Sequence, residues 1–458
     1  MPTDVIDKVI DAEMCVGCGA CAFARPEAYA VEMAGDGHFK ARKQAGTREA
    51  VDPALCPMSG AGEDESAIAA DLYPDLPIDN AVGRYRATFV CHVTEGDFRQ
   101  RGGSGGLVTW LAAELLKTGK VDAVLHVKPV TSGGGDGLLF GYGVSETVEA
   151  VQEGAKSRYY PVEMSRVLDV VRNSEKRFAI IGLPCFVKAV RLLQKQGCLP
   201  KERLAYCIGL VCGHLKSRHF ANYLAWQKGG RPDSIAAFDF RYKIEGRKAS
   251  DYGFSFEPLN DPGWQAGQYW PMRDVKGKNW GEGQFKNPAC EYCEDVLAEC
   301  ADIVVGDAWL PGYVDDFAGT NVVVTRNADI DAIIRAAASR GVVSCTPVAV
   351  ADVIRSQASG LRHRREGTSH RLARLDAAGK WTPRKRVAPK LARSIFRRLI
   401  YDLRLAIARN SSKAFADVLA RGGTIEAYEK AVKRDLALYN FIIRSSNMLK
   451  SVSGKLRR

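Results

Sequence analysis

The sequence predicts an α/β protein with some α+β elements: a small N-terminal module, a central mixed sheet with helices on both faces, and a C-terminal basic helical extension. Three observations predict this arrangement. The first 60 residues are rich in cysteine, near-continuous apolar strands then alternate with amphipathic helices, and the chain turns basic and helical beyond about residue 360. Apolar strands separated by helices of about 10 to 15 residues are typical of a parallel or mixed sheet covered on both faces.

We expect four segments along the chain. Residues 1–60 form the cysteine-rich module, and residues 61–85 form a linker or a loosely attached helix, because they mix acids, prolines and glycines. Residues 86–365 form the sheet-containing domain, and residues 366–458 form the extension. Strands are predicted at 89–93, 121–127, 178–184, 204–212, 301–309 and 320–326, and helices at 105–119, 163–175, 185–197, 330–341, 396–409 and 425–444. Short aromatic strands at 235–242 and 252–258 indicate an antiparallel insertion.

Basic charge is concentrated in the extension. The whole chain has a net charge of +12, but residues 380–458 hold 20 Lys and Arg against 5 Asp and Glu, so the rest of the chain is slightly acidic. This distribution argues against a specific nucleic-acid site in the body of the protein. The extension is either a solvated helical cap or a surface that docks a partner or an anionic membrane. The basic residues beside its apolar helix faces are Arg397, Arg398, Arg404 and Arg409.

The N-terminus, MPTDVIDKVIDAEMC, carries acids and no apolar core, so we expect no signal peptide. The apolar stretches are too short for a transmembrane span. We therefore expect a cytoplasmic protein whose 13 cysteines lie in a reducing compartment, where metal binding and redox roles outweigh disulfides. Cys91, Cys198, Cys207 and Cys345 lie in apolar segments, and we expect them to pack in the core without partners.

The strongest motif is a cluster-binding pattern. Cys15, Cys18 and Cys21 are each separated by two residues, and Cys56 follows further along, directly before a proline. In a [4Fe–4S] site of this type a tight loop supplies three thiolates and a remote Cys-Pro supplies the fourth. Zinc is the alternative, but three cysteines at this spacing suit tetrahedral zinc poorly. The sequence therefore predicts a ferredoxin-like [4Fe–4S] module.

A second set of cysteines is dispersed. Cys185 and Cys212 follow predicted strands, and Cys290 and Cys293 lie in one loop, PACEYCED. Because the carboxyl ends of parallel strands meet at one edge of a sheet, four thiolates can converge there on a second cluster. The alternative is that Cys185 and Cys212 are small buried side chains of the core.

Three features are typical of a phosphate and flavin site. A glycine-rich loop before a predicted helix allows close backbone approach of an anion, although such loops are also ordinary turns. A following loop offers a cation, a hydroxyl and an aromatic ring, and a strand-to-helix turn offers a rigid wall. The candidate residues are Gly103, Ser104, Gly105 and Gly106, then Lys156, Ser157, Arg158 and Tyr159, and finally Gly182 and Pro184. His214 is a candidate proton donor, with an ordinary surface histidine as the alternative.

Seven stretches occur in a characteristic order: CVGCGAC with LCP, GGSGGLVTWLAAELLKTGKVDAVLHV, KSRYY, IGLPCFVKAVR, GLVCGH, DFRYK, and CEYCEDVLAECADIVVGDAWLPG with GTNVVVTR. Together they resemble the beta-subunit family of coenzyme F420 hydrogenases and dehydrogenases. Relatives in that family include plant hydroxymethyl-chlorophyll reductase and a ferredoxin-dependent divinyl-chlorophyllide vinyl reductase. The resemblance runs from about residue 15 to about residue 365, and the basic extension has no counterpart in it.

The resemblance implies an FAD enzyme with [4Fe–4S] clusters. It places residues 103–106 and 156–158 in flavin-contacting loops, and it assigns Cys185, Cys212, Cys290 and Cys293 to recurring cysteine motifs. We expect ferredoxin or a similar carrier to deliver single electrons that reach FAD and then an organic acceptor, or the reverse. The alternative is an electron-transfer subunit whose substrate site lies on a partner chain. A homo-oligomer is a further expectation.

Overall fold

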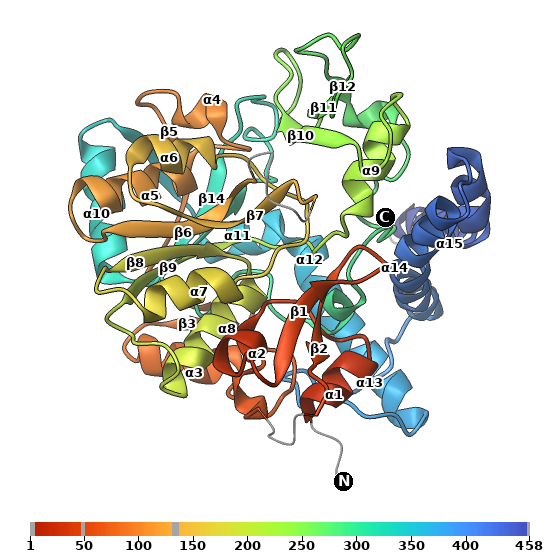
Figure 1. Cartoon of the computed structure of the whole chain (residues 1–458), viewed down its shortest axis with the longest axis horizontal. Helices are drawn as coiled ribbons and strands as arrows, with labels where there is room; N and C mark the ends of the chain where they lie inside the picture. The colour runs from red at the N-terminus through yellow and green to blue at the C-terminus, as the bar shows by residue number, and fades with distance from the viewer. Residues whose placement is uncertain (1–4, 47–50, 131–136, 456–458) are drawn as a thin grey trace.

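The structure is a computed structural model that describes residues 5–46, 51–130 and 137–455, and its centre is an eight-stranded sheet (Figure 1). In spatial order the strands are β15 (Val343–Pro347), β5 (Ala87–Val93), β14 (Asn321–Thr325), β13 (Ile303–Asp307), β9 (Leu204–Leu210), β8 (Phe178–Gly182), β6 (Ala123–Pro129) and β7 (Phe140–Ser145). The pairs β13–β9, β9–β8 and β8–β6 are parallel, and the other pairs are antiparallel. The predicted mixed sheet is therefore confirmed.

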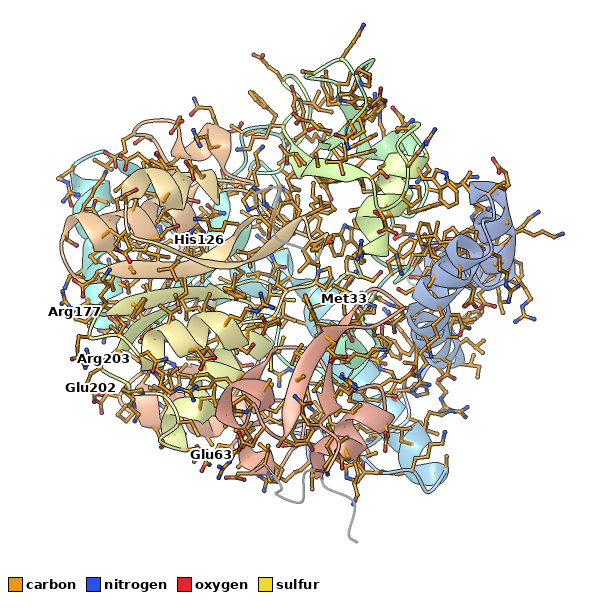
Figure 2. The ribbon with its side chains drawn as sticks, viewed as in Figure 1. Met33, Glu63, His126, Arg177, Glu202 and Arg203 are labelled. Carbon is orange, nitrogen blue, oxygen red and sulfur yellow. A yellow bond between two sulfur atoms is a disulfide. The ribbon has the colours of Figure 1, made fainter. Side chains whose placement is uncertain are left out.

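Five of these strands end at the same edge of the sheet. The antiparallel β14 separates β5 from β13, so β5 runs in the same direction as β13, β9, β8 and β6. Their amino ends carry exposed charged side chains such as Arg177 and Glu202, which lie with Arg203 at one rim of the molecule (Figure 2). Ligand sites of such sheets form at the opposite edge, outside the carboxyl ends.

Helices cover both faces of the sheet, as predicted (Figure 1). Along β8, Phe178 and Ile180 belong to one apolar cluster and Ala179 belongs to another, because successive side chains of a strand point to opposite faces. The first face packs against α7 (Ser165–Arg172) and α8 (Pro184–Lys195), and the second against α5 (Leu107–Lys117), α6 (Val148–Glu153) and α10 (Ala328–Ser339).

The N-terminal module contains α1 (Val5–Asp11), α2 (Ala20–Ala24), β1 (Tyr29–Met33), β2 (Phe39–Lys43) and η1 (Pro53–Leu55). It shares its apolar cluster with α8, so it packs directly on the sheet domain. The segment that we expected to be a linker contains α3 (Glu65–Leu72), β3 (Ile78–Asp79) and β4 (Gly83–Arg84). The segment is not loosely attached, because Glu65 is buried and pairs with Lys188 of α8 at 3.2 Å.

An antiparallel insertion and a helical extension complete the fold. The insertion contains β10 (Ile235–Tyr242), β11 (Gly253–Pro258) and β12 (Trp270–Pro271), which pair in that order, and it follows α9 (His219–Trp226). The shorter helices are α4 (Phe98–Arg101), η2 (Met272–Asp274) and η3 (Pro288–Tyr292). After the sheet come α11 (Val350–Ser356), α12 (Ala358–Arg362), η4 (His363–Gly367), α13 (Thr368–Ala377), α14 (Ile395–Ala420) and α15 (Ile425–Lys455).

The extension packs against the body. Phe415 of α14 and Tyr428 of α15 are fully buried in an aromatic cluster with Phe285. Arg409 of α14 also pairs with Glu13 of the N-terminal module at 2.8 Å, and the module and the helical hairpin lie side by side (Figure 1). These contacts favour the interpretation of the extension as a cap. Among the described residues, no helix is both long enough and apolar enough to cross a membrane.

Cys91 and Cys345 form a disulfide, so the prediction that they lack partners was wrong. The two residues face each other in the antiparallel register of β5 and β15, with their Cα atoms 4.3 Å apart. The edge strand β15 was not among the strands predicted from the sequence, and without that register the pairing could not be seen. Cys198 and Cys207 have free thiols, as expected.

Candidate functional site

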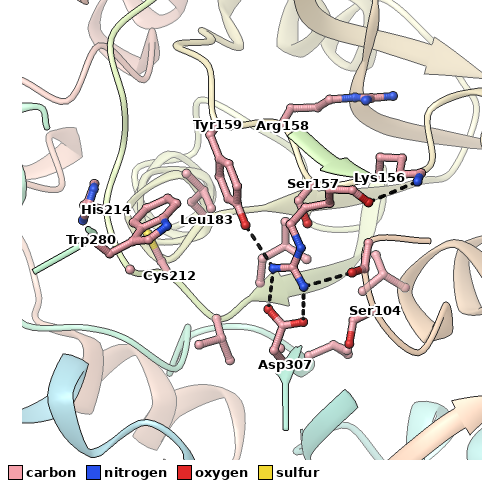
Figure 3. A pocket seen from close by; sticks show the side chains of 18 of the residues that line it. Ser104, Lys156, Ser157, Arg158, Tyr159, Leu183, Cys212, His214, Trp280 and Asp307 are labelled. Carbon is pink, nitrogen blue, oxygen red and sulfur yellow. Dashed lines mark hydrogen bonds and ion pairs between the residues drawn. The ribbon is translucent and has the colours of Figure 1, made fainter. Parts of the chain in front are cut away.

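A cavity of about 760 Å³ lies at the carboxyl ends of the parallel strands (Figure 3). The loops that follow β5, β8, β9 and β13 all contribute to its wall. The predicted site residues that line it are Gly103, Ser104, Gly106, Lys156, Ser157, Arg158, Tyr159, Gly182, Cys212 and His214. Gly105 and Pro184 do not line it. Gly105 packs against Asn321, and Pro184 is buried in the first turn of α8.

The glycine-rich loop has no room for side chains. A Cβ added to Gly103 would lie 2.7 Å from Ser157 Oγ, and one added to Gly105 would lie 2.6 Å from Asn321 Oδ1. Gly106 precedes α5 with a φ of +82°, a conformation that favours glycine. The first amide of α5, on Leu107, donates to Asn321 Oδ1 at 3.2 Å. Val108 and Thr109 of the same turn line the cavity, so the N-terminus of α5 lies at its wall, and a helix N-terminus attracts an anion.

The second loop is held by buried polar contacts. Lys156 has a φ of +95° and pairs with Asp239 at 3.0 Å. The guanidinium of Arg158 lies 4.7 Å from the centre of the Phe140 ring and donates to the carbonyl of Ala155 at 2.8 Å. Burial lowers the pKa of Arg158 to about 10, and its Nε has no partner.

A strand of the insertion joins both loops, a contact that the sequence did not predict. Alternate residues of DFRYK contact them. Asp239 binds Lys156, and Arg241 donates to the Gly103 carbonyl at 3.1 Å and to the Tyr159 hydroxyl at 3.2 Å. Lys243 donates to the carbonyl of Ser104 at 2.9 Å. The DFRYK motif is the only sequence signal for these contacts. Its alternating pattern shows that Asp239, Arg241 and Lys243 share one face of the strand, but not which loops that face contacts.

Arg241 also contacts the sheet, since both of its terminal nitrogens donate to the carboxylate of Asp307 at the end of β13. Only 4% of the Arg241 side chain is exposed. Burial opposes the charged form, but Asp307 and two tyrosines outweigh this and raise the pKa of Arg241. The guanidinium is therefore a fixed positive charge in the wall of the cavity.

The first thiol set surrounds a small hollow. Cys15, Cys18, Cys21 and Cys56 all line a cavity of about 20 Å³ in the N-terminal module. The amides of Gly17 and Ala41 each donate to Cys15 Sγ at 3.4 Å. A Cβ on Gly17, whose φ is +68°, would lie 2.3 Å from the carbonyl oxygen of Phe39, so the loop requires glycine there. Burial raises the pKa of Cys56 to about 11.

The second thiol set is also brought together. Burial raises the pKa of Cys185, and the thiols of Cys293, Cys212 and Cys290 raise it further because they are close to it. The amide of Leu215 donates to Cys290 Sγ at 3.3 Å. Among the described residues, no three His, Cys, Asp or Glu side chains lie close enough to bind one metal ion.

The two sets are neighbours, and the second one reaches the large cavity. Cys18 of the first set is among the thiols that raise the pKa of Cys185. Cys212 lines the cavity beside His214, whose ring lies 4.4 Å from that of Trp280. His214 is buried, which lowers its pKa, and its Nε2 has no partner. The alternative of an ordinary surface histidine was therefore wrong.

Comparisons with known proteins identify the family. Residues 88–169 match the family described as coenzyme F420 hydrogenase/dehydrogenase, beta subunit N-term, and residues 175–350 match the family described as the C terminus of the same beta subunit. The chain is also 25% identical over 235 residues to a coenzyme F420-dependent sulfite reductase of Methanocaldococcus jannaschii. That match covers 46% of this chain and 32% of the sulfite reductase.

A solved structure supports the fold. A chain of the F420-reducing [NiFe] hydrogenase complex from Methanosarcina barkeri superposes with a TM-score of 0.50 at 17% identity, over 67% of this chain and 98% of that one. The family matches indicate an oxidoreductase of the beta-subunit type with an electron-transfer role. The protein therefore belongs to the coenzyme F420 hydrogenase/dehydrogenase beta-subunit family.

Proposed function

We propose that the protein is an iron–sulfur flavoprotein oxidoreductase. It exchanges single electrons with ferredoxin or a similar low-potential carrier and two electrons with an organic acceptor or donor. The observation that carries the proposal is the continuity of three sites: the first thiol set neighbours the second, and the second reaches the large cavity through Cys212. One-electron clusters beside a two-electron flavin supply this chemistry.

The thiol sets fit [4Fe–4S] clusters. Each set offers four thiols, with Cys15, Cys18, Cys21 and Cys56 in the first and Cys185, Cys212, Cys290 and Cys293 in the second. Amide donors reach the sulfur of Cys15 and of Cys290, as expected where a protein tunes a cluster by hydrogen bonds to sulfur. Burial disfavours a free thiolate at these positions, so bound iron would compensate its charge.

The large cavity fits FAD. Its volume of about 760 Å³ lies within the range of cofactor sites, and Gly102, Gly103 and Gly106 of the glycine loop line its wall. Arg158 and Arg241 each have a buried Nε without a partner, so the wall can donate to an anionic group. In this proposal the residues of the glycine loop and of 156–159 hold the diphosphate, and Gly182 and Pro184 form the rigid turn beside it.

His214 is our candidate proton donor to the acceptor. It lines the same cavity as the glycine loop, Trp280 holds its ring, and its Nε2 has no partner. The two rings are tilted by 44° to each other, and this contact restricts the orientation of the imidazole. In this proposal these residues orient an acceptor and hold a proton. The direction of electron flow depends on which electron donor and which acceptor are present.

A second candidate is an electron-transfer beta subunit without a substrate site of its own. The solved structure that this chain resembles is part of a hydrogenase complex, which supports a partner subunit. In that case the isolated chain would reduce artificial dyes but no metabolite, and it would copurify with a larger subunit. Both candidates keep the domain limits 1–60, 61–85, 86–365 and 366–458, a cytoplasmic location and no specific nucleic acid. They also keep a homo-oligomer, and contact of the basic extension with a partner or an anionic membrane surface.

Anaerobic purification with iron, sulfide and flavin analysis tests the proposal. We expect about eight irons and one FAD per chain, because each of the two thiol sets would hold a four-iron cluster. Cys290→Ala should remove about half of the iron and leave the rest. Cys207→Ala is the matched control, because Cys207 is a buried free thiol outside both sets and its loss should leave the iron content unchanged.

A protein that stays colourless after anaerobic reconstitution contradicts the whole proposal. About four irons per chain in the wild type would contradict the second cluster but not the first. Eight irons per chain without bound flavin would support the two clusters but contradict the assignment of the cavity to FAD.

A further inference from the structure

A buried arginine lies against the second thiol set. Arg364 is 1% exposed, and its Nη2 lies 4.0 Å from Cys212 Sγ. Its Nη1 donates to the carbonyl of Cys290 and its Nη2 to the carbonyl of Gly213, both at 2.8 Å. The guanidinium therefore holds the backbone at two of the four thiols while its charge faces their sulfurs.

Arg364 has no carboxylate to balance its charge within the described residues. Its neighbour Arg365 pairs with Glu299, and Arg371 pairs with Glu291, but Arg364 forms no ion pair with an acid. Its Nη2 instead lies 4.0 Å from Cys212 Sγ. A buried cation without a counter-ion is costly, and a cluster held by these thiols would supply the negative charge.

The residue comes from outside the part of the chain that matches the family. The match ends at residue 350, whereas Arg364 lies in η4, a π-helical turn, after α12. The same part of the chain supplies other cations near this site. Lys385 lies close enough to Cys293 and to Cys56 to interact with both thiol sets. Arg404 of α14 lines the large cavity, as does Arg364.

We propose that Arg364 is a positioning residue for the second cluster: it fixes the loops of Cys212 and Cys290 and supplies the positive charge that makes this cluster easier to reduce. The inference rests on the proposed function, since it requires a cluster at the second set. A cluster with four thiolates is anionic and gains one more negative charge on one-electron reduction. A fixed cation beside it favours the reduced form and raises its potential.

The test is a redox titration of the anaerobic holoprotein, followed by electron paramagnetic resonance so that the two clusters are resolved. Arg364→Gln should lower the reduction potential of the second cluster by at least about 59 mV. For one electron this shift is a tenfold change in the reduction equilibrium constant. The first cluster should keep its potential. Arg364→Lys keeps the charge and should shift the second potential less than Arg364→Gln.

Arg365→Gln is the matched control, because it removes the same charge from the next residue of the same turn, where the side chain pairs with Glu299 instead. It should leave both potentials unchanged. Loss of four irons in Arg364→Gln with full iron in Arg364→Lys would also support the proposal, since the site would then need the cation.

Two results would overturn it: eight irons in Arg364→Gln with unchanged potentials, or equal loss of four irons in Arg364→Gln and Arg364→Lys. A wild type with only four irons would overturn the second cluster itself, and the inference with it.

Discussion

Arg241 and Asp307 form a two-point ion pair, in which both terminal nitrogens of the guanidinium donate to the two carboxylate oxygens at 3.1 Å. The pair connects the insertion strand β10 to the end of β13 in the central sheet. Because Arg241 also donates to the Gly103 carbonyl and the Tyr159 hydroxyl, one side chain positions both loops of the candidate flavin site. The site therefore depends on a contact between two separate sheets.

Replacing Arg241 with Gln should weaken both stability and flavin retention. The variant loses charge-assisted hydrogen bonds and leaves a half-buried carboxylate, which together cost about 3 kcal/mol of unfolding free energy. Urea unfolding and flavin content of the purified protein measure the two effects. The exposed Arg231, just before β10, offers a control in which Arg→Gln should change stability by less than about 0.5 kcal/mol. If Arg241→Gln keeps its flavin, the pair does not organise the site.

Gly106→Ala should damage the glycine loop more than Gly119→Ala. Both residues flank α5, and both have positive φ, +82° and +63°. A Cβ at Gly106 would lie 2.6 Å from the carbonyl oxygen of Phe98, whereas nothing lies within 4 Å of one at Gly119. Both positions are left-handed, so the difference between the two variants, on the order of 1 to 3 kcal/mol, comes mainly from the collision. Equal unfolding free energies would show that the loop can move aside.

Most strands of the central sheet, though not its edge strands β7 and β15, and the first thiol set could be predicted because their signals are local. Cys15, Cys18 and Cys21 lie within one short stretch of sequence, and apolar runs identify β8 and β9 wherever they pack. The function of Arg241 could not be predicted, because an alternating strand does not show which loops it will face. Arg364 and the Cys91–Cys345 disulfide depend on segments far apart in sequence, and only the tertiary fold brings them together.

Stability should fall on acidification partly because of His126. The ring lies on β6 (Figure 2), is 3% exposed and bonds Ser145 Oγ through Nε2 at 2.8 Å. Burial and, to a lesser extent, Lys128 lower its pKa to about 4. Between pH 6.5 and pH 4 the unfolded chain therefore binds a proton that the folded protein does not, so the unfolding free energy decreases as the pH falls.

His126→Gln removes this proton-binding difference. The variant should lose less stability than the wild type on acidification from pH 6.5 to pH 4, by about 3 kcal/mol over the window. Urea unfolding at several pH values gives both curves, and His38, whose pKa burial lowers to about 3, remains in both proteins. Parallel curves would mean that His126 takes up its proton in the folded state as readily as in the unfolded chain.

The C-terminal hairpin should prove integral to the fold, as a comparison of two phenylalanines can show. Phe415 of α14 is fully buried, and its ring centre lies 5.1 Å from that of Tyr428 and 5.5 Å from that of Phe285. Phe415→Ala leaves a cavity between the hairpin and the body, so it should cost about 3 to 5 kcal/mol. Phe441 of α15 is 66% exposed, and its removal should cost less than about 0.5 kcal/mol.

Urea unfolding followed by tryptophan fluorescence measures both variants, since Trp226 lies 5.7 Å from Phe415 between ring centres. If the hairpin only rests on the surface, Phe415→Ala and Phe441→Ala should both lower the unfolding free energy by similar, small amounts. A large loss in Phe415→Ala alone would show that residues beyond the family match help to hold the body together. The iron content of Phe415→Ala then separates two functions of the extension. If this variant is less stable but keeps the second cluster, the hairpin stabilises the body, and the contact with the cluster is made by Arg364 in the turn before the hairpin.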